Sequence, residues 1–396
     1  MNMRKFYFLP LIAGTLFAYT SCSNDLVEEI SEELSEHVQT GTPMNFSAQM
    51  GGEANINEHQ SGKRKLTYNE EVYIGNSETK GTVNLMWEVG DKIGVDCPDA
   101  YDVKNAVYRV TGEETWGDFG SYGTLEKTDA SPLKWGEKDA HRVFCGYPAG
   151  KVIMGNLTEG ELPELFSRDC TLTIDKEQNG NVEATKIRKG QACIDGYRVI
   201  DRTNMISGGV QVFYKSETDQ NDEIFLPFDT YFTAFDVIFT NSADQGLTIK
   251  KVKIVAENGE GNEIEALSGK ATGTLAMGGG GFLEIQSIAP TMGESHSEVS
   301  INVKGINGEG TFELQKDNSL SVVLCALPMV LKERPDGKED ADDEVFGYNF
   351  KGTLTVTYNY SGEGEQTKSL DISSLYWANS RNRIVVPALP HVTFPE

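Results

Sequence analysis

Residues 44–50 read MNFSAQM, and this stretch shows the pattern that decides the fold class. Apolar residues alternate along it with polar ones: Met44, Phe46, Ala48 and Met50 against Asn45, Ser47 and Gln49. Because successive side chains of a β-strand point to opposite faces, this alternation predicts a strand with one buried face.

The same pattern recurs over most of the chain beyond it. YFTAFDVIFTN (residues 231–241) places Phe235, Val237 and Phe239 on one face, and GTLTVTYNYSG (residues 352–362) alternates in the same way. Runs rich in Val, Ile, Thr, Phe and Tyr are separated by Gly, Asn, Asp and Ser, and Asn-Gly pairs stand at 179–180, 258–259 and 307–308, where we expect tight hairpins. The sequence therefore predicts an all-β protein.

The length of the chain favours two domains, at roughly 150 to 200 residues each. The most polar interval near the middle is SETDQNDE, residues 216–223. We therefore predict two tandem antiparallel β-sandwich domains, over residues 44–210 and 211–396, because facing sheets are needed to cover the apolar strand faces.

The N-terminus has the layout of a secretory signal, which we assign to residues 1–21. Arg4 and Lys5 precede an apolar stretch over residues 6–18, which is shorter than the about 20 residues that a membrane-spanning helix needs. YTSC, ending at Cys22, resembles a lipobox, so we expect acyl chains on Cys22. Residues 22–43 then form an acidic tether, with a short amphipathic helix as the alternative.

Charge and cysteine content exclude some classes of partner and bond. The chain carries 35 Lys and Arg against 60 Asp and Glu, a formal net charge of −25, which argues against nucleic acid and anionic lipid surfaces. Beyond Cys22 the cysteines show no Cys-x-x-Cys spacing, so we expect small buried residues more than a disulfide; they are Cys97, Cys145, Cys170, Cys193 and Cys325.

No motif of an enzyme, metal site or cofactor site is found in the sequence. The five histidines are scattered without metal-ligand spacing, and the chain lacks a phosphate-binding glycine loop and a nucleophile elbow. The acidic run EDADDE (residues 339–344) lacks the spaced ligands and glycine of a dedicated calcium loop. We expect no catalytic residue, no cofactor and no metal.

Four segments carry a resemblance to a known family: LMWEVGDKIGV (residues 85–95), PLKWGEKDAHRVFCGYPAG (132–150), FTAFDVIFTNSADQGLTIKKVKI (232–254) and LYWANSRNRIVV (375–386). Together with the lipobox they resemble the fimbrillin family of lipoprotein pilins. From the residues themselves we expect Trp87, Val89, Ile93 and Val95 to fill a core around a turn at Gly90–Asp91. We likewise expect Trp135 to pack beside Phe144 and Tyr147, with Pro148 ending that strand.

The resemblance implies a two-domain, transthyretin-like pilin that is lipid-anchored at the outer membrane and exposed in a fimbrium serving adhesion. In the family a maturation protease cuts after Arg or Lys, the first strand leaves, and a strand of another pilin subunit fills the groove. On this chain the leaving strand is residues 44–50. SGKRKLTY (residues 61–68) offers Arg64 as the cleavage site, with Lys65 beside it and Lys80 as the competing site.

The end of the chain supplies the expected donor strand. Residues 384–386, and Val392 with Phe394, could present apolar side chains to a groove, while Pro387, Pro390 and Pro395 suit an edge or an inserted strand. A plain C-terminal edge strand is an equal alternative at this point.

The rival function is that of a surface glycan-binding lipoprotein with the same β-sandwich domains. Such a protein would group exposed aromatic side chains on one face to stack on sugars. Trp87, Trp135 and Trp377 lie in strand-like patterns, whereas Trp116, in EETWGDFG, is expected in a loop and is the possible glycan contact.

Overall fold

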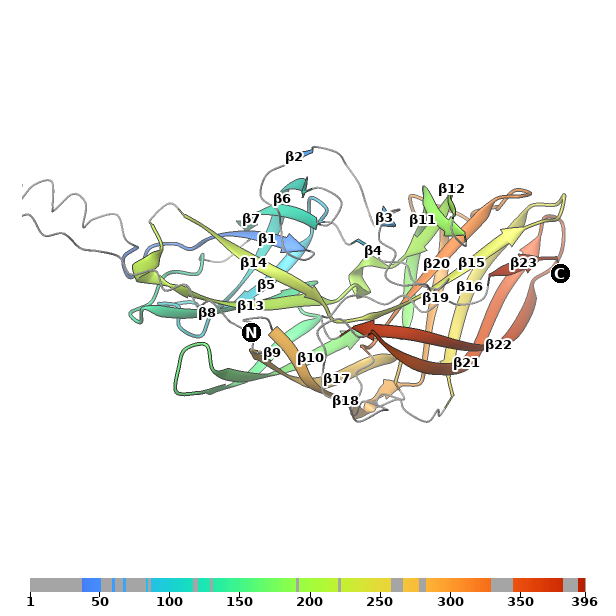
Figure 1. Ribbon diagram of the computed structural model, residues 1–396. Coiled ribbons are helices and arrows are strands. Elements are labelled where there is room, and N and C mark those ends of the chain that lie inside the picture. Colours follow the sequence, from blue (N-terminus) through green and yellow to red (C-terminus); the bar gives the residue numbers. More distant parts are fainter. Residues whose placement is uncertain are drawn as a thin grey trace, which may run out of the picture. The chain divides into compact units, whose positions relative to one another are not determined.

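The computed structural model describes residues 38–50, 59–60, 67–68, 83–84, 87–116, 120–128, 131–189, 192–219, 222–257, 266–277, 283–328, 345–379 and 391–395. Strands dominate these residues (Figure 1), and their only helices are the short 3-10 turns η1 (Arg202–Asn204) and η2 (Lys215–Glu217). The all-β prediction is confirmed. None of the described helices has the length and apolarity to cross a membrane.

An eight-stranded sheet contains the strand that opened the sequence. In order across the sheet its strands are β2 (His59–Gln60), β6 (Asn105–Trp116), β5 (Lys92–Asp96), β8 (Ala140–Tyr147), β13 (Ser207–Tyr214), β14 (Glu223–Thr230), β1 (Asn45–Met50) and β7 (Gly120–Lys127). β6 also pairs with β7, so the sheet closes on itself. Closure removes the free edges that an open sheet would have at these strands.

The remaining strands form three further sheets. A four-stranded sheet has the order β18 (Leu283–His296), β17 (Ser268–Met277), β10 (Phe166–Ile174) and β9 (Val152–Glu159). A nine-stranded sheet has the order β22 (Gln366–Asn379), β21 (Val345–Tyr360), β16 (Leu247–Ala256), β19 (Glu298–Ile306), β11 (Glu177–Lys189), β12 (Ala192–Ile200), β20 (Ser319–Ala326), β15 (Thr233–Asn241) and β23 (Val392–Phe394). β3 (Thr67–Tyr68) pairs with β4 (Val83–Asn84).

Most strand pairs are antiparallel, as predicted, and four are parallel: β1–β14, β11–β19, β12–β20 and β15–β23. Residues 38–396 form one compact unit. Residue 210 lies inside β13, which pairs with β8 before it and β14 after it. The predicted division at residue 210 therefore does not coincide with a boundary between sheets.

Two hydrophobic cores fill the curled sheets. Core 1 contains Phe46, Trp87 and Phe144, and core 2 contains Phe235, Val237 and Phe239, the face expected from YFTAFDVIFTN. Every residue of β20 is buried, with alternate side chains in different cores. Core 1 takes Val323 and Cys325 from this strand, whereas core 2 takes Val322 and Leu324.

Some local expectations are confirmed and others are corrected. Asn307 and Gly308 have φ angles of 59° and 81°, as a tight hairpin turn requires. Asn179–Gly180 lies inside β11 instead of at a turn. A Cβ on Gly180 would stand 2.4 Å from Val199 Cγ1, so this glycine allows close packing.

The predicted tether and cysteines also differ in part from expectation. Residues 38–43 of the expected acidic tether belong to the folded body, because Val38 is buried in core 1. Four cysteines are buried and belong to no disulfide, namely Cys97, Cys145, Cys170 and Cys325. Burial raises the pKa of Cys97 and of Cys170 to about 12, so both remain thiols at neutral pH. Cys193 lies in β12, with its side chain outside the described residues.

Candidate functional site: the slot that holds the first strand

β1 is an internal strand of the closed sheet (Figure 1). It runs parallel to β14, with Asn45 opposite Glu223 and Ala48 opposite Leu226, and antiparallel to β7, with Ala48 opposite Gly123. Its backbone is therefore paired on both sides. If this strand left, two strands would each present an unpaired row of backbone groups to the vacated position, which we call the slot.

The apolar face of β1 points into core 1, as the alternation predicts. Met44, Phe46 and Ala48 are 3%, 2% and 0% exposed, while Asn45 is exposed. The ring of Phe46 meets that of Tyr108 edge to face, with centroids 5.2 Å apart. The side chain of Met50 lies outside the described residues.

Ser47 is the polar exception on this strand. Its side chain is completely buried, and its hydroxyl has no hydrogen-bond partner among the described residues. Across the sheet it stands opposite Phe225 of β14 and Thr124 of β7. A buried hydroxyl without a partner costs about 1 to 3 kcal/mol, so Ser47 lowers the stability with which β1 is bound in the slot.

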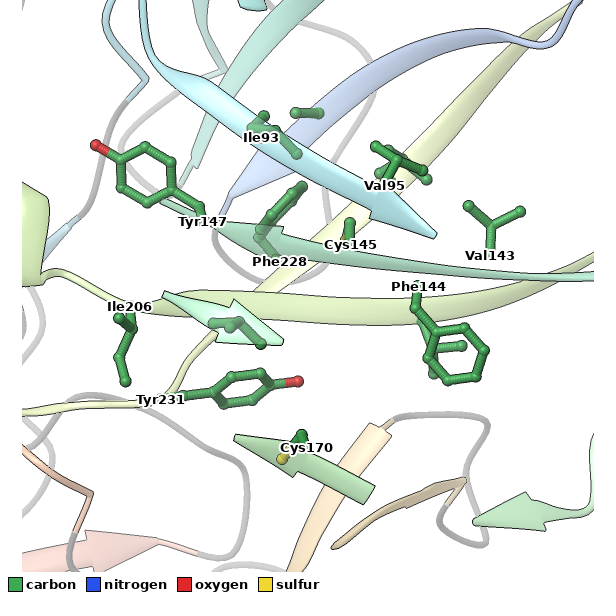
Figure 2. Packing of buried hydrophobic residues seen from close by; sticks show 14 of the residues in the cluster. Ile93, Val95, Val143, Phe144, Cys145, Tyr147, Cys170, Ile206, Phe228 and Tyr231 are labelled. Atoms are coloured by element: carbon green, nitrogen blue, oxygen red, sulfur yellow. The ribbon is translucent and has the colours of Figure 1, made fainter. Parts of the chain in front are cut away.

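Trp87 packs in core 1 against residues of β14 and β8, and it lies close to Gly123 of β7. Its indole meets Phe228 of β14 at a centroid distance of 4.8 Å and Tyr147 of β8 at 5.3 Å, both edge to face. A Cβ on Gly123 of β7 would stand 3.3 Å from this indole and 3.1 Å from Val110. Figure 2 shows Tyr147 and Phe228 in this part of core 1.

Two of the segments that carried the resemblance, residues 85–95 and 132–150, meet at this place. The Tyr147 hydroxyl donates a hydrogen bond of 3.0 Å to Asp91 Oδ1, and the N–H of Glu88 donates to Asp91 Oδ2 at 2.9 Å. Gly90 takes a φ of +103° in the predicted turn. Val89 is 56% exposed, so its expected core position is wrong, because the turn points it outward.

Two ion pairs tie η1 to the turn that follows Trp87. Arg202, from η1, forms ion pairs with Glu88 and with Asp91. Burial and the neighbouring Asp91 carboxylate raise the pKa of Tyr147, so its phenol stays protonated and donates. The motifs thus have a structural role, holding Trp87 beneath the slot.

The residues leading into β1 are fixed by backbone hydrogen bonds: Val38 N–H donates to Thr218 O at 3.2 Å, and the others go to one neighbouring segment. Gly41 N–H donates to Trp135 O at 2.8 Å, Trp135 N–H to Thr42 O at 2.9 Å, and Met44 N–H to Leu133 O at 2.9 Å. We call residues 38–44, bound in this way, the clasp. The clasp must open before β1 can leave.

Lys215 of η2 closes the clasp from outside. Its ammonium donates to Thr40 Oγ1 and Gly136 O, each at 3.1 Å, and to Glu137 O at 3.3 Å. Thr40 Oγ1 in turn donates to Gly136 O at 3.0 Å. One lysine therefore bridges the clasp and the segment that it binds.

His141 supports that segment from inside. Its buried ring accepts a hydrogen bond from Gly136 N–H at Nε2 (2.7 Å), so the proton of the neutral ring is on Nδ1, which faces Asp139 O at 3.1 Å. The ring also meets Trp135 edge to face at 4.8 Å. Desolvation lowers the pKa of His141, because burial disfavours the imidazolium.

A buried ion pair lies next to this support. Asp99 accepts two side-chain hydrogen bonds of 2.9 Å from Arg142 and one of 2.9 Å from Lys138. Burial opposes ionisation of Asp99, but these hydrogen bonds prevail and hold its pKa well below the usual range. Arg142 follows His141 in β8, so the pair fixes the start of that strand against the loop at Asp99.

The C-terminal strand occupies a place in its own sheet. β23 pairs with β15 in parallel, with Val392 opposite Phe239, and Val392 and Phe394 are buried in core 2. Phe394 O accepts a 2.6 Å hydrogen bond from Ser242 N–H. Residues 392–394 are thus an edge strand of their own sheet in this structure. Residues 384–386 lie outside the described residues.

Most of the predicted site residues fall outside the described part of the chain. This holds for Cys22, Arg64, Lys65 and Lys80, whose predicted roles stay predictions. The expectation of a loop at Trp116 is wrong for its backbone, which ends β6 and pairs with His59 and Gly120. The side chain of Trp116 is not among those described, so a glycan contact there also stays a prediction.

Sequence reasoning missed Gly123, Lys215, His141 and the unpaired Ser47 hydroxyl. A glycine inside the strand-like run GSYGTLEK was the one available signal, because strand glycines often mark a close approach. Within the described ranges, no three His, Cys, Asp or Glu side chains gather in a way that could hold a metal ion.

These features define an all-β protein of curled, β-sandwich-like sheets, whose N-terminal strand is held between two others. No protein-family model and no curated protein matches the chain. Among solved structures it is similar to a candidate cell adhesion protein from Bacteroides ovatus, with 11% identity, 90% of this chain and 100% of that chain covered, and a TM-score of 0.37.

Two further solved structures are named for fimbriae. A fimbrial assembly protein from Parabacteroides distasonis has 9% identity, coverage of 87% of this chain and 98% of that chain, and a TM-score of 0.28. The fimbrial anchor protein Mfa2 from Porphyromonas gingivalis has 12% identity, coverage of 80% and 78%, and a TM-score of 0.21. These names are in keeping with the resemblance to the fimbrillin family, but so distant a likeness assigns no function to this chain.

Proposed function

We propose that this chain is a non-enzymatic fimbrial subunit, anchored to the outer membrane through Cys22 and serving adhesion. In this proposal a maturation protease cuts after Arg64, β1 leaves with the N-terminal piece, and a strand of another subunit takes its place. Main-chain hydrogen bonds to β7 and β14 would give affinity, and the alternate side-chain positions would set the register.

The position of β1 is the observation that carries the proposal. A strand inside a closed sheet, near the N-terminus and followed at residues 63–65 by the basic triplet Lys-Arg-Lys, can be separated from the body by one cut. Its loss would leave the facing edges of β7 and β14 unpaired, and a second strand with apolar side chains at alternate positions could satisfy both edges.

The burial of β1 also bears on the order of events. Met44 and Phe46 together are worth roughly 3 to 6 kcal/mol of burial, to which the two hydrogen-bonded ladders and the clasp add. Cleavage alone therefore does not expel the strand. In our proposal the incoming strand displaces a cleaved piece that is still bound.

Limited digestion of the mature protein with Cys22→Ser, by an arginine-specific protease, tests this function. We expect a cut after Arg64, followed by SDS-resistant oligomers that lack residues 44–50. Arg64→Gln should remain uncut and monomeric, while Arg109→Gln, at an exposed arginine inside β6, is the matched control and should behave as the parent does. A cut protein that stays monomeric at high concentration would contradict strand exchange.

A further inference from the structure

The slot is narrow at one point along β1. Ala48 is completely buried between Gly123 of β7 and Leu226 of β14. Even one added carbon on Gly123 would come within 3.3 Å of Trp87 and 3.1 Å of Val110. Side chains at directly opposed positions lie on the same face of a sheet, so Ala48 points to the side that Trp87 fills.

Trp87 has little freedom to give way at this point. Its indole is 2% exposed and is enclosed by the rings of Phe228 and Tyr147, and Tyr147 is itself tied to Asp91. Two positions earlier, the slot accommodates Phe46 beside Tyr108. The slot is thus wide at the Phe46 position and narrow at the Ala48 position.

We infer that Trp87 and Gly123 select the strand that enters the slot by requiring a small side chain at the Ala48 position, two residues after a bulkier apolar one. The inference rests on the proposed strand exchange and adds a rule for which strand is accepted. It also fixes the register, because a slip by two residues would bring a large side chain against Trp87.

The rule distinguishes the two candidate donor stretches at the C-terminus. Ile384, Val386 and Ala388 fall at the Met44, Phe46 and Ala48 positions, so this stretch of a second copy of the chain has the required pattern. Aligned in the same way, Val392 and Phe394 would bring Glu396 to the narrow point. The occupant is therefore the stretch of sequence around residues 384–388 of a neighbouring copy.

The residue at the Ser47 position weakens the binding of β1 in the slot. The incoming strand would bring Pro387 where β1 has a buried hydroxyl without a partner among the described residues. Proline carries no side-chain polar group to bury, but it lacks the backbone N–H, so one acceptor of the slot loses its donor and the two effects offset each other. Ser47→Ala in the leaving strand should accordingly slow its displacement.

Labelled peptides test the rule on the cleaved protein. The probes are a fluorescein-labelled peptide of residues 42–50, its Ala48→Leu variant, and its Asn45→Leu variant, which places the same leucine at an exposed position. We expect the native and Asn45→Leu peptides to bind alike and Ala48→Leu to bind at least about tenfold more weakly, because overpacking a filled core is costly. A peptide of residues 382–390 should bind, and its Ala388→Leu variant should not.

A protein variant supplies the reciprocal measurement. Trp87→Phe enlarges the narrow point, so it should restore binding of the Ala48→Leu peptide. Equal binding of the Ala48→Leu and Asn45→Leu peptides to the parent protein would overturn the size rule while leaving strand exchange intact. If neither the native peptide nor that of residues 382–390 enters the slot, strand exchange itself is overturned, and the rule with it.

Discussion

The hydroxyl of Tyr147 donates a hydrogen bond to Asp91 Oδ1 at 3.0 Å, across 56 positions of the sequence. Tyr147 ends β8, and Asp91 follows the turn that leads into β5. Trp87 packs on the ring of the same tyrosine. The segments at residues 85–95 and 132–150, which are separate in the sequence, therefore pack together and hold Trp87 beside the slot.

Removing this hydroxyl should destabilise the fold without changing its shape. Tyr147→Phe keeps the ring against Trp87 but removes one of the donors to Asp91. We therefore expect the free energy of unfolding to fall by about 1.5 to 3 kcal/mol, the usual value for a hydrogen bond to a charged group. Urea denaturation followed by tryptophan fluorescence measures it. Tyr101→Phe, at a ring that is 50% exposed, is the control and should change little.

The clasp should loosen when its lysine is neutralised. Lys215→Met keeps the aliphatic stem but loses the donors to Thr40 and Gly136. We expect amide hydrogen exchange at Gly41 and Met44 to accelerate about 5- to 10-fold, as loss of roughly 1 kcal/mol of local stability implies. Lys250→Met, which removes an exposed ion pair with Glu365, should leave these two amides unchanged. Unchanged exchange in Lys215→Met would refute the bridging role.

Acid should destabilise the support beneath the clasp. The pKa of His141 is lowered in the folded state, so between that pKa and the about 6.5 of the unfolded chain the unfolded state binds more protons. The neutral His141 ring makes its whole contribution to the free energy of unfolding above about pH 6.5. This contribution falls as the pH drops towards the pKa of the folded state. His141→Gln should flatten this fall, as measured by thermal unfolding from pH 7 to pH 5; a fall as steep as in the parent would contradict it.

Asp236 should make stability change with pH in the opposite direction to His141 over part of the same pH range. This carboxyl in β15 is buried and accepts a 2.7 Å hydrogen bond from Ser321, and burial raises its pKa to about 7. Between about pH 4 and 7 the folded state keeps a proton that the unfolded state has released, so its contribution to stability falls as the pH rises.

Asp236→Asn removes this titration and keeps an acceptor for Ser321. The stability of the variant relative to the parent should therefore rise from pH 4 to pH 7, by at most about 4 kcal/mol. Denaturant unfolding at both pH values measures the difference. Asp244→Asn, on an exposed carboxylate, is the matched control, and a pH-independent difference for Asp236→Asn would argue against the raised pKa.

The sequence predicted those features that depend on local periodicity. Alternation in MNFSAQM identified a strand with Met44, Phe46 and Ala48 inside, and Pro148 marked the end of β8. Val89 defeated the same reasoning because Gly90 takes a positive φ and turns the chain there. Period-2 patterns identify faces only while the backbone stays extended.

The pairing of distant strands could not be predicted in this way. Nothing local to β1 specifies that β14 is its parallel neighbour or that Gly123 stands opposite Ala48. His141 and Lys215 were also unmarked, since their roles depend on the carbonyls and amide that the fold brings within 3.3 Å. Non-local pairing is decided by the total burial that the chain achieves, which single-segment patterns do not contain.

The position of β20, with alternate side chains in both cores, limits how this molecule can be dissected. If the chain were divided between the two cores, only one part could keep residues 319–326. The other core would lose the β20 side chains that pack in it, and the apolar residues they cover would be exposed to water. The halves are consequently not interchangeable modules. An exchange of segments between related proteins would have to transfer β20 together with the residues of both cores that pack against it.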